Sequence, residues 1–128
     1  MLVELQQAAR LPAFRTWAET LVAWLDRRPG EMLAALERLS AILIVEDPEH
    51  VFLRGWLLCD VGEHQHGLAY LRRAVAKGYF AAPTLEGRPE FAALRGEPAF
   101  DEVLAEAQAG RQRAFAAFRE SGGERLLG

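Results

Sequence analysis

The sequence predicts an all-α protein, and three observations lead to this prediction. Its 128 residues include 22 Ala and 19 Leu but only 2 Ile, 7 Val and 3 Thr, so strong helix formers dominate and strand formers are scarce. Apolar residues recur at spacings of three and four, which is the period of an amphipathic helix. Proline and glycine separate these stretches, where helices begin and end.

Composition also limits the classes of function. With 51% hydrophobic residues, residues 1–128 are expected to form a single domain with a packed core. A formal charge of −3 gives no reason to expect binding to nucleic acid or to a membrane surface. No apolar run reaches the roughly 20 residues of a membrane span, and the first ten residues do not resemble a signal peptide. Cys59, the single cysteine, cannot form an internal disulfide. We therefore expect a cytoplasmic protein.

Two helices are predicted in the first part of the chain. The first covers about residues 12–28, because Pro12 suits a first helical turn and the apolar residues after it form one stripe. Pro29-Gly30 breaks the chain, and residues 31–46 form the second helix. Residues 1–10 can form a short additional helix.

Two further helices follow the same plan. Asp47 is suited to cap the third helix and Pro48 to occupy its first position, and this helix runs to Val61-Gly62. The fourth covers about residues 64–77 and ends at Gly78.

The last part of the sequence has a less regular pattern. Residues 79–89 contain two prolines and a glycine without a sustained period, and are expected to form a loop. A short helix is predicted around residues 89–95 and a longer one around 98–120, with Gly110 as a possible kink. The hydrophobic Leu126 and Leu127 near the end of the chain are expected to prefer an apolar groove to water.

An internal repeat is the most informative feature. When the chain is shifted against itself by 32 residues, several anchors coincide: Trp24 with Trp56, Leu25 with Leu57, Gly30 with Gly62, Glu31 with Glu63, Leu36 with Leu68, and Leu39 with Leu71. Each unit is a helix, a turn and a helix, and stacked units would build a continuous core. We expect units at residues 12–46 and 47–78, followed by capping helices within 90–128.

These units resemble the tetratricopeptide repeat family. The resemblance rests on a turn glycine followed five residues later by a small and then a large apolar residue, which here read Gly30 with Ala35-Leu36, and Gly62 with Gly67-Leu68 and later Ala74. The family period is 34 rather than 32, and Ile42 replaces a small residue in the first unit. The resemblance implies a short α-solenoid, and another array of antiparallel helical hairpins is the alternative fold.

The resemblance also implies a binding surface, because the first helix of each unit would line a concave groove. A protein or peptide partner would bind there, with no catalytic activity and no cofactor, and Arg27 and Arg28 would select acidic side chains. The candidate partner-binding residues are Thr20, Trp24, Arg27, Arg28, Phe52, Trp56 and Cys59. The competing interpretation is that both tryptophans fill the core. The family's carboxylate clamp uses Asn and Lys, whereas this chain has no Asn and only Lys77.

Two other functions are alternatives to peptide binding. A homodimer could form through apolar surface left on the terminal helices. A metal-assisted hydrolase could use His64 and His66, but this cluster straddles a turn, so we expect no metal site. No nucleophile elbow, phosphate-binding loop or metalloprotease helix occurs in the sequence. Three arginines near the end of the last predicted helix are interleaved with phenylalanines, and we interpret them as its solvated side rather than as a nucleic-acid surface. They are Arg111, Arg113 and Arg119, with Phe115 and Phe118.

Overall fold

The structure is a computed structural model that describes residues 2–43 and 45–122. Every regular element in these two ranges is a helix, which confirms the all-α prediction. The elements are α1 (Leu2–Leu25), α2 (Pro29–Ile42), α3 (Pro48–Asp60), α4 (His64–Ala76), α5 (Ala82–Gly87), the short 3₁₀ helix η1 (Pro89–Leu94) and α6 (Pro98–Glu120). None of them combines the length and apolar character needed to cross a bilayer.

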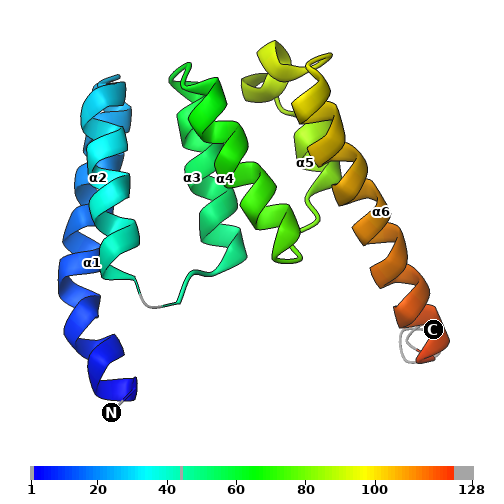
Figure 1. The fold of residues 1–128 in the computed structure, drawn as a ribbon, viewed down its shortest axis with the longest axis horizontal. Coiled ribbons are helices and arrows are strands. Elements are labelled where there is room, and N and C mark those ends of the chain that lie inside the picture. The colour runs from blue at the N-terminus through cyan, green and yellow to red at the C-terminus, as the bar shows by residue number, and fades with distance from the viewer. Residues whose placement is uncertain (1, 44, 123–128) are drawn as a thin grey trace.

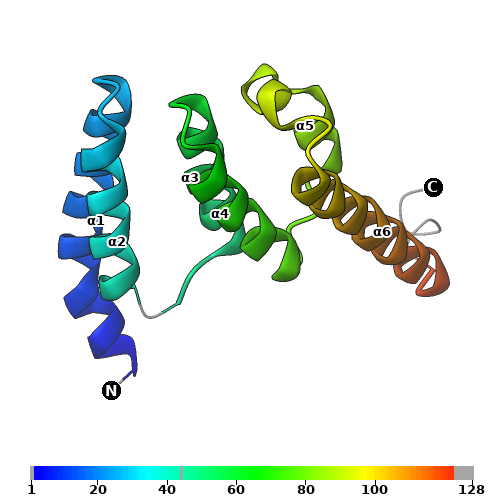
Figure 2. The ribbon, with the colours of Figure 1, turned by 45° about the horizontal axis from the view of Figure 1, so that its top comes forward.

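The helices run alternately up and down in a row (Figure 1). α1 and α2 form one antiparallel hairpin and α3 and α4 form a second, and the backbones approach most closely within each hairpin. α5 and α6 follow as a third antiparallel pair, with η1 connecting them near the tip. The same order is visible after rotation, with α1 and α6 at opposite ends of the row (Figure 2).

The predicted boundaries of α3, α4 and α6 agree closely with the structure. Asp47 caps α3 by accepting a hydrogen bond from the backbone N–H of Glu49 at 2.9 Å, and Pro48 occupies the first turn. α4 ends shortly before Gly78, whose φ of 99° is the left-handed conformation that glycine adopts readily.

The first hairpin departs from the prediction at both outer ends. α1 begins at Leu2 and continues through Pro12, so the expected short helix and the helix at 12–28 are one element. Proline removes one backbone donor but its φ is compatible with a helix. α2 ends at Ile42 rather than at residue 46, because Leu43 is extended and begins the connection to α3.

The predicted loop at residues 79–89 contains α5, so that expectation was wrong. Pro83 lies in the first turn of α5, where a proline is tolerated, and Leu85 is fully buried. A helix of six residues is too short to establish a period in the sequence.

Leu126 and Leu127, which were expected to prefer an apolar groove, lie outside the described residues.

The two hairpin turns have the same backbone hydrogen bonds, but their spacing along the chain differs from the 32 residues of the sequence comparison. Arg28 donates its backbone N–H to the carbonyl of Ala23, and Glu63 donates to Leu58, both at 2.9 Å. The left-handed residue of the first turn is Arg27, with φ of 55°, and that of the second is Gly62. Residue 62 follows residue 27 by 35 positions, so the turns repeat every 35 residues rather than 32. In this register, Trp24 does not correspond to Trp56.

Two clusters of buried side chains form the core. One lies among α3, α4 and the C-terminal elements, with Phe91 and Phe100 at its centre. The other joins the two hairpins and includes Met32 and Leu58. Tyr70 packs against both clusters, so α3 and α4 link the two halves of the core.

Two glycine positions fix how closely these helices pack. In the second hairpin, a Cβ on Gly55 would lie 2.9 Å from the carbonyl oxygen of Gly67, so α3 and α4 cross at glycines. Gly110 does not interrupt α6, which is a continuous helix from Pro98 to Glu120. A Cβ on Gly110 would overlap the ring of Phe80, so this glycine makes room for an aromatic side chain instead of bending the helix.

Candidate docking surface

Three of the seven predicted partner-binding residues lie in the interior. Thr20 is fully buried and donates its hydroxyl to the carbonyl oxygen of Thr16 at 2.9 Å. Phe52 and Cys59 belong to the core cluster around α3 and α4. These side chains therefore stabilise the fold and are not presented on the surface of the described chain.

Trp24 and Arg27 are held by Asp60, which joins the first hairpin to the second. The indole Nε1 of Trp24 and the guanidinium Nη1 of Arg27 both donate to Asp60 Oδ2, each at 2.8 Å. Arg27 also reaches the backbone carbonyl of Asp60 at 3.2 Å. This contact was not predicted from the sequence, because Asp60 lies 36 positions from Trp24. Arg28 remains exposed and pairs with Glu31 at 3.5 Å.

We expect Asp60→Ala to destabilise the protein more than Asp60→Asn. Alanine leaves the partly buried indole N–H of Trp24 without an acceptor, whereas the asparagine amide oxygen can replace it. The expected loss for alanine is about 1–3 kcal/mol, the cost of leaving one such group unpaired. Urea denaturation followed by tryptophan fluorescence measures both variants. Equal losses would show that Trp24 does not depend on this acceptor.

Trp56 is half-buried and is tied to the C-terminal elements. Its ring lies 6.5 Å from Phe52 and 6.1 Å from Phe91, centroid to centroid. The guanidinium of Arg88 stacks on it at 5.1 Å and also pairs with Glu90 at 3.0 Å. The pKa of the Glu90 carboxyl is lowered most by a hydrogen bond from the backbone of Glu90 itself, and next by the hydrogen bond from Arg88. Trp56 thus contributes mainly to packing between α3 and η1.

The thiol of Cys59 is expected to be unreactive in the folded protein. Burial raises its pKa to about 12, from an ordinary value of 9.0. Since the thiolate is the reactive species and each pKa unit is a factor of ten, the thiolate population at neutral pH falls about a thousand-fold. Iodoacetamide should therefore label Cys59 rapidly in urea and very slowly in buffer. Rapid labelling in buffer would show that the second hairpin opens readily.

The histidine cluster provides no coordination site within the described chain. His66 Nδ1 lies 3.2 Å from Glu63 Oε2, one turn away on the same helix start. Within residues 2–43 and 45–122, no three His, Cys, Asp or Glu side chains converge on a common point where a metal ion could sit.

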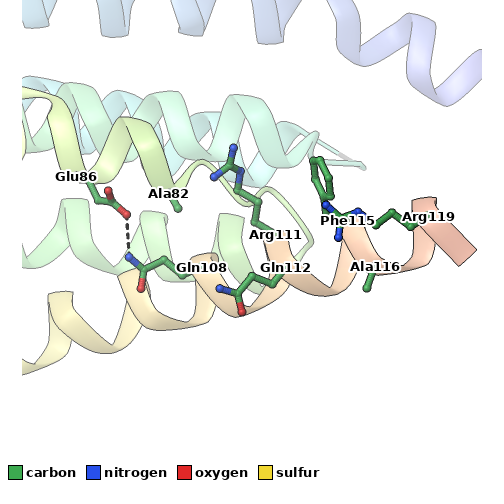
Figure 3. Close-up of a pocket in the computed structure, with 8 residues that line it drawn as sticks. All are labelled: Ala82, Glu86, Gln108, Arg111, Gln112, Phe115, Ala116 and Arg119. Atoms are coloured by element: carbon green, nitrogen blue, oxygen red, sulfur yellow. Dashed lines mark hydrogen bonds between the residues drawn. The ribbon is translucent and has the colours of Figure 1, made fainter. Parts of the chain in front are cut away.

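An open groove lies between α5 and α6 (Figure 3), and we call it the α5–α6 groove. Its volume is about 700 Å³. Glu86 of α5 accepts a hydrogen bond from Gln108 of α6 at 2.7 Å and closes one end. Arg111, Phe115 and Arg119 project from successive turns of α6 along the rest of it.

The second half of α6 extends beyond the rest of the fold, and we call residues 111–120 the α6 overhang. Every residue of the overhang is exposed, whereas the first half of the helix buries Phe100, Val103 and Ala107. Phe115 is 53% exposed and Phe118 is 41% exposed. The guanidinium of Arg119 lies over the Phe115 ring at 5.1 Å. The sequence interpretation of a solvated helix face did not anticipate two exposed phenylalanines on an unsupported helix.

Comparison with known proteins gives no match: no protein-family model, no curated protein and no solved structure is similar to this chain.

Proposed function

We propose that the protein is a non-enzymatic interaction module, a short tetratricopeptide-like array that binds an amphipathic helix of a partner protein. The partner helix would lie in the α5–α6 groove and against the α6 overhang. The observation that carries this proposal is the overhang itself, ten consecutive residues without burial that include Phe115 and Phe118. Exposed apolar surface of this kind, rimmed by charged groups, is typical of protein-binding sites.

The equivalence of the two hairpin turns supports the tetratricopeptide-like arrangement. Both turns use the same hydrogen bonds, and their spacing of 35 residues is close to the family period of 34. The close crossing of α3 and α4 at Gly55 and Gly67 also agrees with the small residues that the family has at this point. The first hairpin differs, because it has Thr20 and Met32 in the corresponding places.

The charge of the overhang suggests which partner it prefers. Arg111, Arg113 and Arg119 outnumber Glu120, although the chain as a whole carries a formal charge of −3. A helix with an apolar stripe and acidic flanks would complement this surface, since arginine pairs with carboxylates in bidentate geometry. Isolated helices shorter than about 12–15 residues are marginal in water. A partner that covers Phe115 and Phe118 would therefore also stabilise the overhang.

Site-specific crosslinking tests this proposal. A photoreactive benzoylphenylalanine at Gln112, inside the groove, should capture a protein from a native lysate, and mass spectrometry should identify the crosslinked peptide. That peptide, made synthetically, should form an acidic amphipathic helix. It should bind the wild-type chain and lose affinity at least about ten-fold with Phe115→Ser, which removes a central aromatic anchor.

Two controls keep the result specific. The same photoreactive residue at the exposed Glu37 of α2 should not capture that peptide. Leu25→Ser, which removes an apolar residue of α1 that is more exposed than Phe115, should leave peptide affinity unchanged. The proposal fails if both positions capture the same proteins, or if Phe115→Ser binds the peptide as well as the wild type does.

The exposed face of α1 favours a second candidate, a homodimer. Leu11, Phe14, Val22 and Leu25 are all more than half exposed. Leu11 and Leu25 each lie seven positions from Ala18, and Phe14 and Val22 each lie four positions from it. Two antiparallel copies of α1 crossing at Ala18 would therefore place Leu11 against the partner's Leu25. Sedimentation tests this candidate. The wild type should be a dimer, and Val22→Glu, which places a charge on the exposed face of α1, should be a monomer.

A further inference from the structure

A small groove lies where α1, α2 and α3 meet, beside the connection between the two hairpins, and we call it the Arg54 groove. Its volume is about 300 Å³, at the lower end of the range for small-molecule sites. The wall is mostly apolar, and Trp17, Leu39, Leu43 and Leu53 form much of it. It is separate from the α5–α6 groove and involves different helices.

Arg54 lines this groove from the middle of α3. Its side chain is only 4% exposed, and its Nη1 donates to Glu46 Oε1 at 3.1 Å. Its Nε is buried and has no hydrogen-bond partner among the described residues. A buried donor without an acceptor is unfavourable, so a ligand that supplies an acceptor would be favoured.

Positive charge exceeds negative charge around Arg54. Glu46 is shared among three cations, because it also forms an ion pair with Arg73 and lies 3.8 Å from the ammonium of Lys77. One carboxylate therefore faces three positive groups. Arg73 and Lys77 are 44% and 40% exposed, so Arg54 is the buried cation of the three, and an additional anion at the groove would stabilise it.

Arg10 adds a further positive charge to the lining of the groove. Arg10 and His50 line it, and neither has an ion-pair partner among the described residues. No carboxylate lines the described groove. The groove thus has an apolar wall and hydrogen-bond donors, and no acidic group among its described lining residues.

We propose that the Arg54 groove binds a small amphipathic monocarboxylate. The apolar body of the ligand lies against Trp17 and Leu53, its carboxylate accepts the Nε–H of Arg54, and Arg10 closes over it at the mouth. A neutral apolar ligand would leave that N–H unpaired. A phosphate would bring two charges and several acceptors to a site that offers one free buried donor.

Calorimetric titration of the full chain with octanoate tests this proposal, with octylamine and 1-octanol as probes of the same length. Octanoate should bind, and the two other probes should bind at least about ten-fold more weakly, since neither supplies the charge-assisted hydrogen bond that a carboxylate forms with an arginine. Arg54→Lys should weaken octanoate binding by a similar factor, because lysine lacks the Nε–H. Ala13→Leu places extra methyl groups in the groove and should abolish binding.

Arg15→Gln is the matched control, because Arg15 lies on the same helix as Arg10 but lines a different groove. It should leave octanoate affinity unchanged, whereas Arg10→Gln should lower it. If Arg54→Lys does not fold, Arg10→Gln and Ala13→Leu decide the question. The proposal is overturned if the wild type does not bind octanoate, if octylamine binds equally well, or if Ala13→Leu retains binding.

Discussion

Phe91→Ala should destabilise the protein by about 3–5 kcal/mol, the range typical of large aromatic residues truncated in a core. Phe91 is fully buried, and its ring lies 6.2 Å from both Phe52 and Phe100. These contacts join η1 to α3 and to α6. Truncation therefore leaves a cavity where three elements meet, and a thermal melt monitored by circular dichroism measures the loss.

Phe115→Ala is the matched control, because the same side chain is removed from an exposed position. Its effect on stability should stay within about 0.5 kcal/mol, as for most surface substitutions. A loss below about 1 kcal/mol for Phe91→Ala would contradict the central position of Phe91 in the core. A large loss for Phe115→Ala would show instead that the α6 overhang is packed in solution.

Gly67→Ala and Gly30→Ala should change stability in opposite directions. A Cβ on Gly67 would lie 2.5 Å from the sulfur of Cys59 and 2.9 Å from the carbonyl oxygen of Gly55. α3 and α4 would have to separate, at a cost of about 1–3 kcal/mol or more. A Cβ on Gly30 would have open space around it, within helix α2.

For Gly30→Ala we therefore expect a gain of about 0.5–1 kcal/mol, because alanine loses less conformational entropy in a helix. Urea denaturation compares the two variants under identical conditions. If Gly67→Ala were neutral, the close crossing of α3 and α4 would not contribute to stability. If Gly30→Ala were strongly destabilising, residue 30 would require a conformation that only glycine adopts readily.

The sequence predicted the helices that have strong signals at both ends. Asp47-Pro48 and Gly78 delimit α3 and α4 because capping and left-handed conformations depend on particular residue types. The extension of α1 through Pro12 could not be predicted, because proline suits a first turn better than a helix interior. The repeat register was also missed. Arg27 adopts the conformation that Gly62 adopts, and an arginine gives no signal for it.

The candidate sites were harder to predict than the helices. The pairing of Trp24 and Arg27 with Asp60 depends on the stacking of two hairpins, which the repeat comparison placed in a different register. Arg54 did leave a signal in the sequence. It lies three positions from Val51 and four from Leu58, on the buried face of α3. A charged residue at such a position requires a partner in the interior.

The division of the core into two clusters has a consequence for folding cooperativity. The first hairpin is joined to the second by side chains such as Leu57 and Leu58 and by the Asp60 contact, while Phe91 and its neighbours stabilise only the remainder. In arrays of this kind, stability is the sum of each unit and its interface with the next. We therefore expect the amide hydrogens of the α1–α2 hairpin to exchange through an opening of that hairpin alone, at a lower free energy than the exchange of the core amides of α3 to α6.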